Sequence, residues 1–320
     1  MYRKFILVLF LVSNLFSEEP RALVMKAFDD INESFNYNRG SYLILLPEGL
    51  NEIFLTNESY GGDFVKFKRS QGFDVDVMTV SASLTAQQVK DTIIMPYYES
   101  SNGMLEYVLL VGDVNGSYSI PPHTIPSYNE SDLDVTDYPY TFFDNDPLNA
   151  EFIIGRWPIR TQDDLKKIKK RSIQYVRMDY IGDYSFLNNA LVVAGNFSDA
   201  DTLSWPVTPV WTSKWLTDEL SSYGFNQVDT AFFHLQNQQA ENPLIRSSWN
   251  SGVGIVNYRG WGDANGWHKP YFHRENIDPG LNNGWYLPIV MSFVCNTGDF
   301  GNDYGGSGLD KSFGEVLITG

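Results

Sequence analysis

Short apolar runs alternate along the chain with amphipathic stretches whose apolar residues recur at helical spacing. An apolar run bounded by Gly or Pro indicates a strand buried on both faces, as in a parallel sheet. We expect strands at 41–46, 73–78, 107–111, 151–157, 190–195, 227–233, 254–258 and 287–294. Residues 73–78 alternate between apolar and polar, which favours a strand nearer the edge of its sheet. We expect helices at 61–70, 85–98, 161–180, 211–223 and 243–250. Strands and helices that alternate at such short intervals favour parallel pairing through right-handed crossovers. The pattern therefore predicts an α/β fold.

The predicted elements divide into two consecutive α/β subdomains with mainly parallel sheets, residues 41–180 and 188–320, without a flexible linker between them. A short arm, residues 18–40, precedes the first strand. Residues 114–150 interrupt the alternation because they are rich in Pro, Asn, Asp, Ser and Tyr. Long loops of this kind in compact domains are usually functional.

The first 17 residues have the pattern of a secretory signal peptide. The basic Arg3 and Lys4 precede an apolar run from Phe5 to Val12, and cleavage after Ser17 is plausible. The apolar run is too short to span a bilayer, and no later segment is long enough to do so. We therefore expect a protein that is secreted or displayed on the cell surface.

The formal net charge is −16, which opposes binding to nucleic acid or to anionic membranes. The densest basic cluster, Lys166 to Arg171, has a helical period and follows two aspartates. Acids at the start of a helix and bases further along suit the helix dipole, so the sequence favours a solvated helix face over a nucleic-acid site.

The last predicted strand ends in Cys295, the one cysteine of the chain, and a Gly298-Asp299 turn follows. Residues at the carboxyl ends of parallel strands lie where α/β proteins place their chemistry. Cys295 is therefore a candidate nucleophile, and a buried inert thiol is the alternative. With one cysteine no internal disulfide can form, and an unpaired thiol in an exported protein favours a function for it.

A base for this thiol is available from the preceding strand. Residues 254–258 lead into a loop rich in Gly and Trp that ends at His268. If the two strands are neighbours in a parallel sheet, their loops bring a histidine and a cysteine to one edge. The backbone amides of Gly262 and Cys295 are candidates for the oxyanion site of an acyl transfer.

Several segments together resemble the gingipain-type cysteine peptidases, which are secreted and have a caspase-like fold. The resemblance covers about residues 41–320 and rests on 109–113, 151–156, 254–262, 295–300 and 312–317. It implies an endopeptidase with a protein or peptide substrate, with Cys295 as nucleophile and Glu151 as the acid that orients the catalytic histidine. It also implies a caspase-like three-layer sandwich in the second subdomain. Members of this family continue beyond the point that matches Gly320, so we expect a chain truncated at its C-terminal end.

The sequence departs from the family pattern at Trp261, which stands where the family has its catalytic histidine. Three interpretations stay open: His268 serves as the base, His273 does so, or the site is inactive and the fold serves as a binding or surface module. An exported structural component of a secretion or gliding system is a further alternative. Trp261 and Trp267 flank this loop and are candidates for substrate binding.

The acidic side chains of the long loop are candidate calcium ligands, since Ca²⁺ takes six to eight oxygens and the family commonly binds it. They are Asp132, Asp134, Asp137, Asp144 and Asp146. A merely solvated acidic loop is the alternative, and the chemistry itself requires no cofactor. Asp163 could select a basic substrate side chain, although the helix dipole also explains an acid there. The sequence leaves the oligomeric state open.

Overall fold

The computed structural model describes residues 39–126, 133–143, 147–179, 182–195, 208–233, 243–301 and 311–320. The chain divides into two units, Met1–Arg39 and Gly40–Gly320. The predicted signal peptide and the arm up to residue 38 lie outside the described residues. None of the described helices combines the length and the apolar character needed to cross a membrane.

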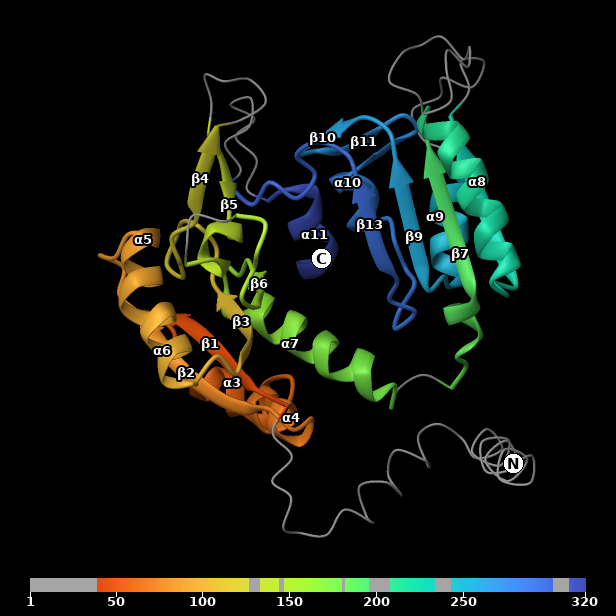
Figure 1. Ribbon diagram of the computed structural model, residues 1–320. Helices are drawn as coiled ribbons and strands as arrows, with labels where there is room; N and C mark the ends of the chain where they lie inside the picture. The colour runs from red at the N-terminus through yellow and green to blue at the C-terminus, as the bar shows by residue number, and fades with distance from the viewer. Residues whose placement is uncertain are drawn as a thin grey trace, which may run out of the picture. The chain divides into compact units, whose positions relative to one another are not determined.

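The first sheet has four parallel strands in the order β2-β1-β3-β6 (Figure 1). The strands are β1 Ser41–Pro47, β2 Asp74–Val80, β3 Leu105–Val111 and β6 Ile153–Trp157. β2 lies at the edge and its side chains alternate between exposed and buried, as the alternating pattern of that segment predicts. All four strands fall where the apolar runs place them, so this part of the prediction is confirmed.

Both faces of the first sheet are covered by helices, because successive side chains of a strand point to opposite faces. On one face, Tyr42, Ile44 and Leu46 of β1 share a core with side chains of α3, α4 and α7. On the other face, Leu43 and Leu45 share a core with side chains of α5 and α6. The helices are α3 Ile53–Thr56, α4 Phe64–Ser70, α5 Ala86–Val89, α6 Met95–Ser100 and α7 Gln162–Arg177. The helix expected at 85–98 forms as α5 and α6 joined by a π-helical segment, η2 Lys90–Ile94.

The interrupting stretch between β3 and β6 contains a two-stranded antiparallel hairpin, β4 His123–Pro126 and β5 Leu133–Thr136. The same stretch contains a short 3₁₀ helix, η3 Tyr138–Thr141. Two other short 3₁₀ helices lie elsewhere in the described residues: η1 Glu58–Tyr60 between α3 and α4, and η4 Ser185–Asn188 before β7. The hairpin was not expected from the sequence, because its strands are short and none of their residues is buried.

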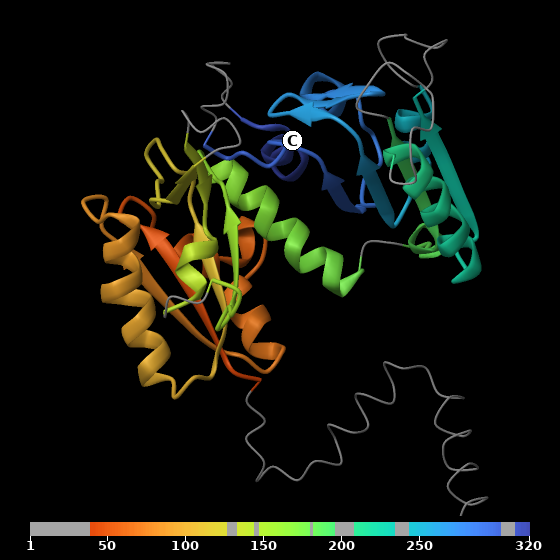
Figure 2. The ribbon, with the colours of Figure 1, turned by 45° about the horizontal axis from the view of Figure 1, so that its top comes forward.

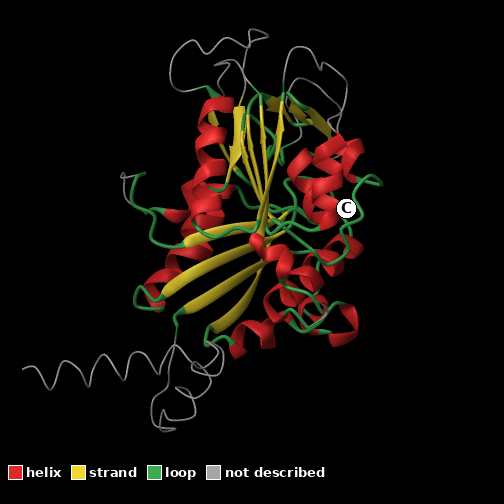
Figure 3. Ribbon diagram, turned by 90° about the vertical axis from the view of Figure 1, so that its right-hand side faces the viewer, coloured by secondary structure: helices red, strands yellow, loops and turns green. Residues whose placement is uncertain are grey.

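The second sheet also has four parallel strands, in the order β13-β9-β7-β8. They are β7 Asn189–Ala194, β8 Gln227–Phe232, β9 Ile255–Arg259 and β13 Ile289–Phe293. Its helices are α8 Pro209–Ser222, α9 Pro243–Ser251, α10 Arg274–Ile277 and α11 Phe313–Thr319. Side chains of α9, α10 and α11 share one core with alternate residues of β7 and β9, whereas α8 packs on β7 and β8 with Val210 buried. Figure 3 shows helices on both sides of the strands, so the predicted three-layer α/β architecture is confirmed.

β13 differs from the expectation of a strand buried on both faces. It lies at the edge of the second sheet, and Ile289 and Phe293 are 55% and 54% exposed. The expectation was wrong because an apolar run shows only that the side chains of a segment are hydrophobic. It does not show that another strand or helix of the fold packs against them.

The basic cluster of α7 also differs from the expected solvated face. Lys169 is fully buried, and its ammonium group donates to carbonyls at the end of α3, among them Leu55 O at 3.4 Å. Burial lowers the pKa of Lys169 to about 8. Arg171 donates to Ile318 O at 2.9 Å and to Gly320 O. Cations therefore cap the C-terminal ends of α3 and α11, and the two views in Figures 1 and 2 show α7 running between these elements.

Candidate active site

The candidate site is built on the carboxyl ends of two neighbouring strands. β13 pairs in parallel with β9, with Phe293 opposite Arg259, as the loop argument from the sequence requires. Cys295 lies two residues beyond β13, and the histidine loop begins directly after β9. The guanidinium of Arg259 donates to Phe293 O at 3.2 Å, which ties the two strand ends together.

The histidine loop folds as a small antiparallel sheet of three strands, β10 Gly262–Asp263, β11 Gly266–His268 and β12 Tyr271–His273. We call it the base hairpin. Directly paired residues lie on the same face of a sheet, so the pairing separates two sets of side chains. Trp267 and Phe272 face the core and are fully buried. Asp263, His268 and His273 belong to the opposite face.

On that outer face three side chains form a hydrogen-bonded row. His268 Nε2 lies 3.1 Å from Asp263 Oδ2, and His268 Nδ1 lies 3.1 Å from His273 Nε2. An ionised carboxylate can only accept, so a neutral His268 donates Nε2–H to Asp263. Its Nδ1 lone pair then accepts a hydrogen bond from His273 Nε2–H. The acid thus sets the tautomer and leaves Nδ1 as the basic nitrogen.

His273 is the more enclosed of the two imidazoles. Its ring lies 3.8 Å from that of Tyr271, and its Nδ1 is 3.8 Å from Glu275 Oε1. Burial, and next the neighbouring His268, hold the pKa of His273 below its ordinary value. His273 therefore favours the neutral state in which it donates to His268.

Cys295 is exposed and unpaired. Within the described part of the chain no hydrogen bond reaches its Sγ. The next residue, Asn296, has φ = +55°, a left-handed conformation that Asn tolerates better than most residues. The backbone therefore turns sharply after the thiol and leaves it at the surface.

Gly262, the candidate oxyanion donor, lies against the loop that follows β13, residues 294–301, which we call the cysteine loop. A Cβ at this position would be 2.4 Å from Gly266 O, within the base hairpin itself, and 3.3 Å from Val294 Cγ2 of the cysteine loop. Glycine is thus required at this position for the close pairing of β10 with β11, and it also keeps the contact with Val294 free of crowding. Its role as an oxyanion donor stays a prediction.

Glu151 does not have the position that the resemblance implied. It is exposed at the start of β6, and its Oε2 accepts a hydrogen bond of 2.8 Å from the Tyr98 hydroxyl. The acid that contacts His268 is Asp263 instead. Sequence reasoning missed Asp263, although the turn Asp263-Ala264-Asn265-Gly266 signals a hairpin that would place it beside His268.

The two candidate substrate-binding tryptophans have different environments. Trp267 is fully buried, and its ring stacks on Tyr258 at a centroid distance of 4.4 Å, so its assignment to substrate binding was wrong. Trp261 is 49% exposed, and its ring lies 5.1 Å from that of His268. Trp261 therefore remains available to a substrate.

The remaining acidic candidates find other partners. Asp163 is exposed and pairs with Lys167, four residues later on α7, at 3.5 Å, which supports the helix-dipole interpretation. Asp137 accepts from Arg156 through both carboxylate oxygens, at 2.8 and 2.7 Å, so it is already neutralised and does not suit a calcium ion. Asp132, Asp144 and Asp146 lie outside the described residues. In the residues that the structure describes, Asp134 included, no group of three or more acidic, His or Cys side chains could hold a metal ion.

A three-layer α/β unit with a cysteine after one parallel strand and a histidine in its neighbour's loop defines the class of caspase-like cysteine peptidase folds. The chain belongs to peptidase family C25, whose family model matches residues 36–320. This result confirms the family and the fold class that the sequence motifs indicated.

Individual relatives agree with this assignment. Gingipain R2 of Porphyromonas gingivalis is 26% identical over 283 residues, which is 85% of this chain and 36% of the relative. Gingipain R1 of the same species is 26% identical over 273 residues, 83% of this chain and 26% of the relative. The chain thus spans about a third of the length of gingipain R2 and about a quarter of that of gingipain R1.

Two solved structures share the fold. The crystal structure of the Arg-specific cysteine proteinase gingipain R aligns with a TM-score of 0.69 at 22% identity, over 90% of this chain and 60% of that one. The complex of the pro- and mature domains of Porphyromonas gingivalis RgpB aligns with a TM-score of 0.70 at 23% identity, over 88% and 60%. At these identities the structures support the fold alone.

Proposed function

We propose that this chain carries the catalytic site of an exported cysteine endopeptidase, with Cys295 as nucleophile and His268 as general base. The observation that supports the proposal most is the row of Asp263 and His268 on the loop after β9, beside the strand that leads to Cys295. A thiol needs a neighbouring base because free cysteine is only partly ionised at neutral pH.

In this mechanism the Cys295 thiol gives its proton to His268 Nδ1, and the thiolate attacks the carbonyl carbon of a peptide bond. Asp263, which accepts from Nε2–H, stabilises the imidazolium that forms. The imidazolium then protonates the leaving amine, and water hydrolyses the thioester to regenerate the thiol. The amides of Gly262 and Cys295 are the candidate oxyanion donors, each worth about 3–4 kcal/mol by comparison with other enzymes.

His273 has a specific part in this proposal. In the resting structure it occupies Nδ1 of His268, the nitrogen that must receive the thiol proton. The proton transfer therefore requires that His268 Nδ1 lose its hydrogen bond from His273 and accept one from the Cys295 thiol instead. His273 is a competitor of the thiol in this account, and not a second base.

The test is thiol-dependent cleavage of a peptide library, assayed with and without calcium. Cys295→Ala should abolish cleavage, and His268→Ala should reduce it to the level of the cysteine variant. His273→Phe keeps an aromatic ring beside Tyr271 but removes the competing N–H, so it should retain cleavage. Loss in His273→Phe with full activity in His268→Ala would assign the base to His273.

A non-catalytic binding or surface module is the second candidate. Two observations favour it: both nitrogens of His268 are occupied, and Trp261 stands at the position of the expected histidine. Under this alternative the wild-type chain cleaves no member of the library, while Cys295→Ala binds the same partners as the wild type.

A further inference from the structure

The first turn of α11 contacts both loops of the candidate site. Phe313 N–H donates to Ala264 O in the turn of the base hairpin, at 2.8 Å, and Gly314 N–H donates to Thr297 O, two residues after Cys295, also at 2.8 Å. The first amides of a helix have no acceptor within the helix, so they are free to bind elsewhere. Here they join the base hairpin to the cysteine loop.

Side chains strengthen the same junction. The Phe313 ring, fully buried, lies 5.2 Å from the Trp267 ring. Trp267 Nε1–H donates to Ser292 Oγ at 2.9 Å, and Ser292 Oγ lies 3.0 Å from Thr297 Oγ1. A Cβ at Gly314 would lie 3.1 Å from Thr297 O, so a side chain there would crowd the cysteine loop. The start of α11 thus fixes the position of one loop against the other.

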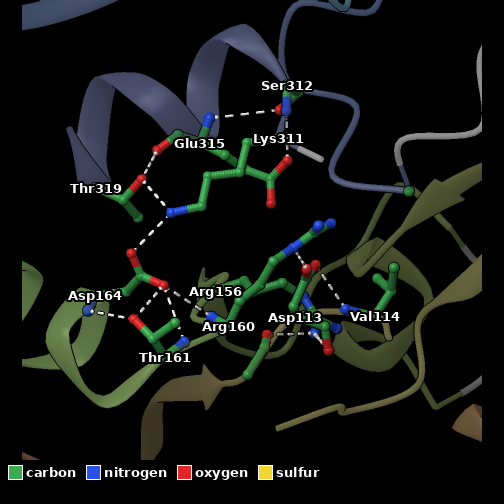
Figure 4. Close-up of polar contacts among 12 residues, drawn as sticks. Asp113, Val114, Arg156, Arg160, Thr161, Asp164, Lys311, Ser312, Glu315 and Thr319 are labelled. Carbon is green, nitrogen blue, oxygen red and sulfur yellow. Dashed lines mark hydrogen bonds and ion pairs between the residues drawn. The ribbon is translucent and has the colours of Figure 1, made fainter. Parts of the chain in front are cut away.

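The start of α11 is in turn held by the first sheet's helix α7. Lys311 Nζ pairs with Asp164 Oδ1 at 2.7 Å and donates to Thr319 Oγ1 at 3.0 Å (Figure 4). The other oxygen of Asp164 accepts from the Thr161 amide at 2.9 Å and from its hydroxyl at 2.9 Å. The Asp164 side chain is only 8% exposed. A buried, fully hydrogen-bonded acid gives the ion pair a defined geometry.

We propose that Lys311 is a positioning residue of the active site. Through its ion pair with Asp164 it anchors the first turn of α11, and this turn sets the distance between His268 and Cys295. The inference rests on the proposed function for its effect on catalysis, but the anchoring of α11 can be measured without activity.

The test compares Lys311→Met with a matched variant, Lys167→Met. Lys167 also reaches from α7 to α11, but at its C-terminal end, where Nζ lies 3.2 Å from Thr319 O. Each variant removes one cation from the α7–α11 contact. We expect both to unfold at lower denaturant concentration. Only Lys311→Met should lower kcat, by roughly 10- to 100-fold at unchanged KM, as expected for misplaced catalytic groups.

Lys311→Arg should restore kcat because the guanidinium can keep the pair with Asp164. Equal losses of kcat in the Met variants of Lys311 and Lys167 would overturn the proposal, since a merely structural contact affects both alike.

A second readout separates this proposal from the proposed function. Amide hydrogen exchange at Phe313 and Gly314 should accelerate at least tenfold in Lys311→Met and stay near the wild-type rate in Lys167→Met. Unchanged exchange in Lys311→Met would refute the anchoring even if the enzyme is active. If exchange accelerates while Cys295→Ala retains cleavage, the anchoring stands and the assignment of the nucleophile fails.

Discussion

At the scale of single residues, the candidate site depends on which side chains share the outer face of the base hairpin. Strand pairing places Asp263, His268 and His273 there and sends Trp267 into the core. Loss of an acid that fixes the tautomer of a catalytic histidine can lower kcat by several orders of magnitude. The contact of Asp263 with His268 therefore leads to a direct prediction about a single residue.

We predict that Asp263→Asn lowers kcat for peptide cleavage by roughly 100-fold or more, because the amide can stabilise neither the required tautomer nor the imidazolium. Glu151→Gln is the matched control, since Glu151 contacts Tyr98 and not a histidine. Steady-state kinetics of the two variants decide the question. A large loss in Glu151→Gln beside an active Asp263→Asn would restore the assignment implied by the family resemblance.

His273 makes the stability of the fold depend on pH. Its pKa is lower in the folded chain than in the unfolded chain, chiefly because of burial, so the unfolded chain binds more protons below about pH 6.5. The free energy of unfolding should therefore fall as the pH drops below 6.5. Urea unfolding at pH 5.0 and 7.5 measures this dependence. The difference between the two pH values should be smaller in His273→Phe, and an unchanged difference would contradict the prediction.

The sequence alone could indicate Cys295 and His268, because apolar runs predict strands and strand ends predict an edge of the sheet. It could not indicate that both nitrogens of His268 are occupied, since that depends on the register of three two- and three-residue strands. Trp267 was misassigned for the same reason. In a strand, a shift of one residue exchanges the core face for the solvent face.

At the scale of elements, the strands and most helices could be predicted from periodicity and caps. Thr161, at the start of the helix expected over 161–180, caps α7 with its side chain accepting from the Asp164 amide at 3.1 Å. The partners of exposed-looking charges could not be predicted. The sequence of α7 alone predicts a solvated basic face. In the structure, however, Arg171 and Lys167 donate to carbonyls at the end of α11, which are 147 and 152 residues away in the sequence.

We predict that Arg171→Met destabilises the fold by about 1 kcal/mol, the size expected for charged hydrogen bonds near the surface. Lys214→Met is a suitable control, because this lysine is exposed and lies on α8, which is a different helix from α7 and α11. Chemical denaturation of the two variants provides the comparison. Equal stability of Arg171→Met and the wild type would show that the cap of α11 contributes nothing measurable.

At the scale of the whole molecule, the two sheets are coupled through α7 and α11, and the same contacts support the loops of the candidate site. Arg156 of β6 shows a second link. Its guanidinium pairs with Asp137 and lies 5.0 Å from the ring of Phe300, which follows Cys295 closely in the chain. Two of the segments that carry the family resemblance thus meet in space. Motif matching identifies such segments, but only the fold shows that they touch.

The most direct test of the central claim is the rate of Cys295 alkylation by iodoacetamide at pH 6.5. Because Cys295 is exposed, labelling alone does not distinguish an active thiol from an idle one. If His268 exchanges His273 for Cys295 in the free protein, as the mechanism requires, the thiol should react at least tenfold faster at this pH than a free cysteine peptide, and His268→Ala should abolish the difference. If the wild type, His268→Ala and the peptide react at the same rate, Cys295 is not an activated nucleophile.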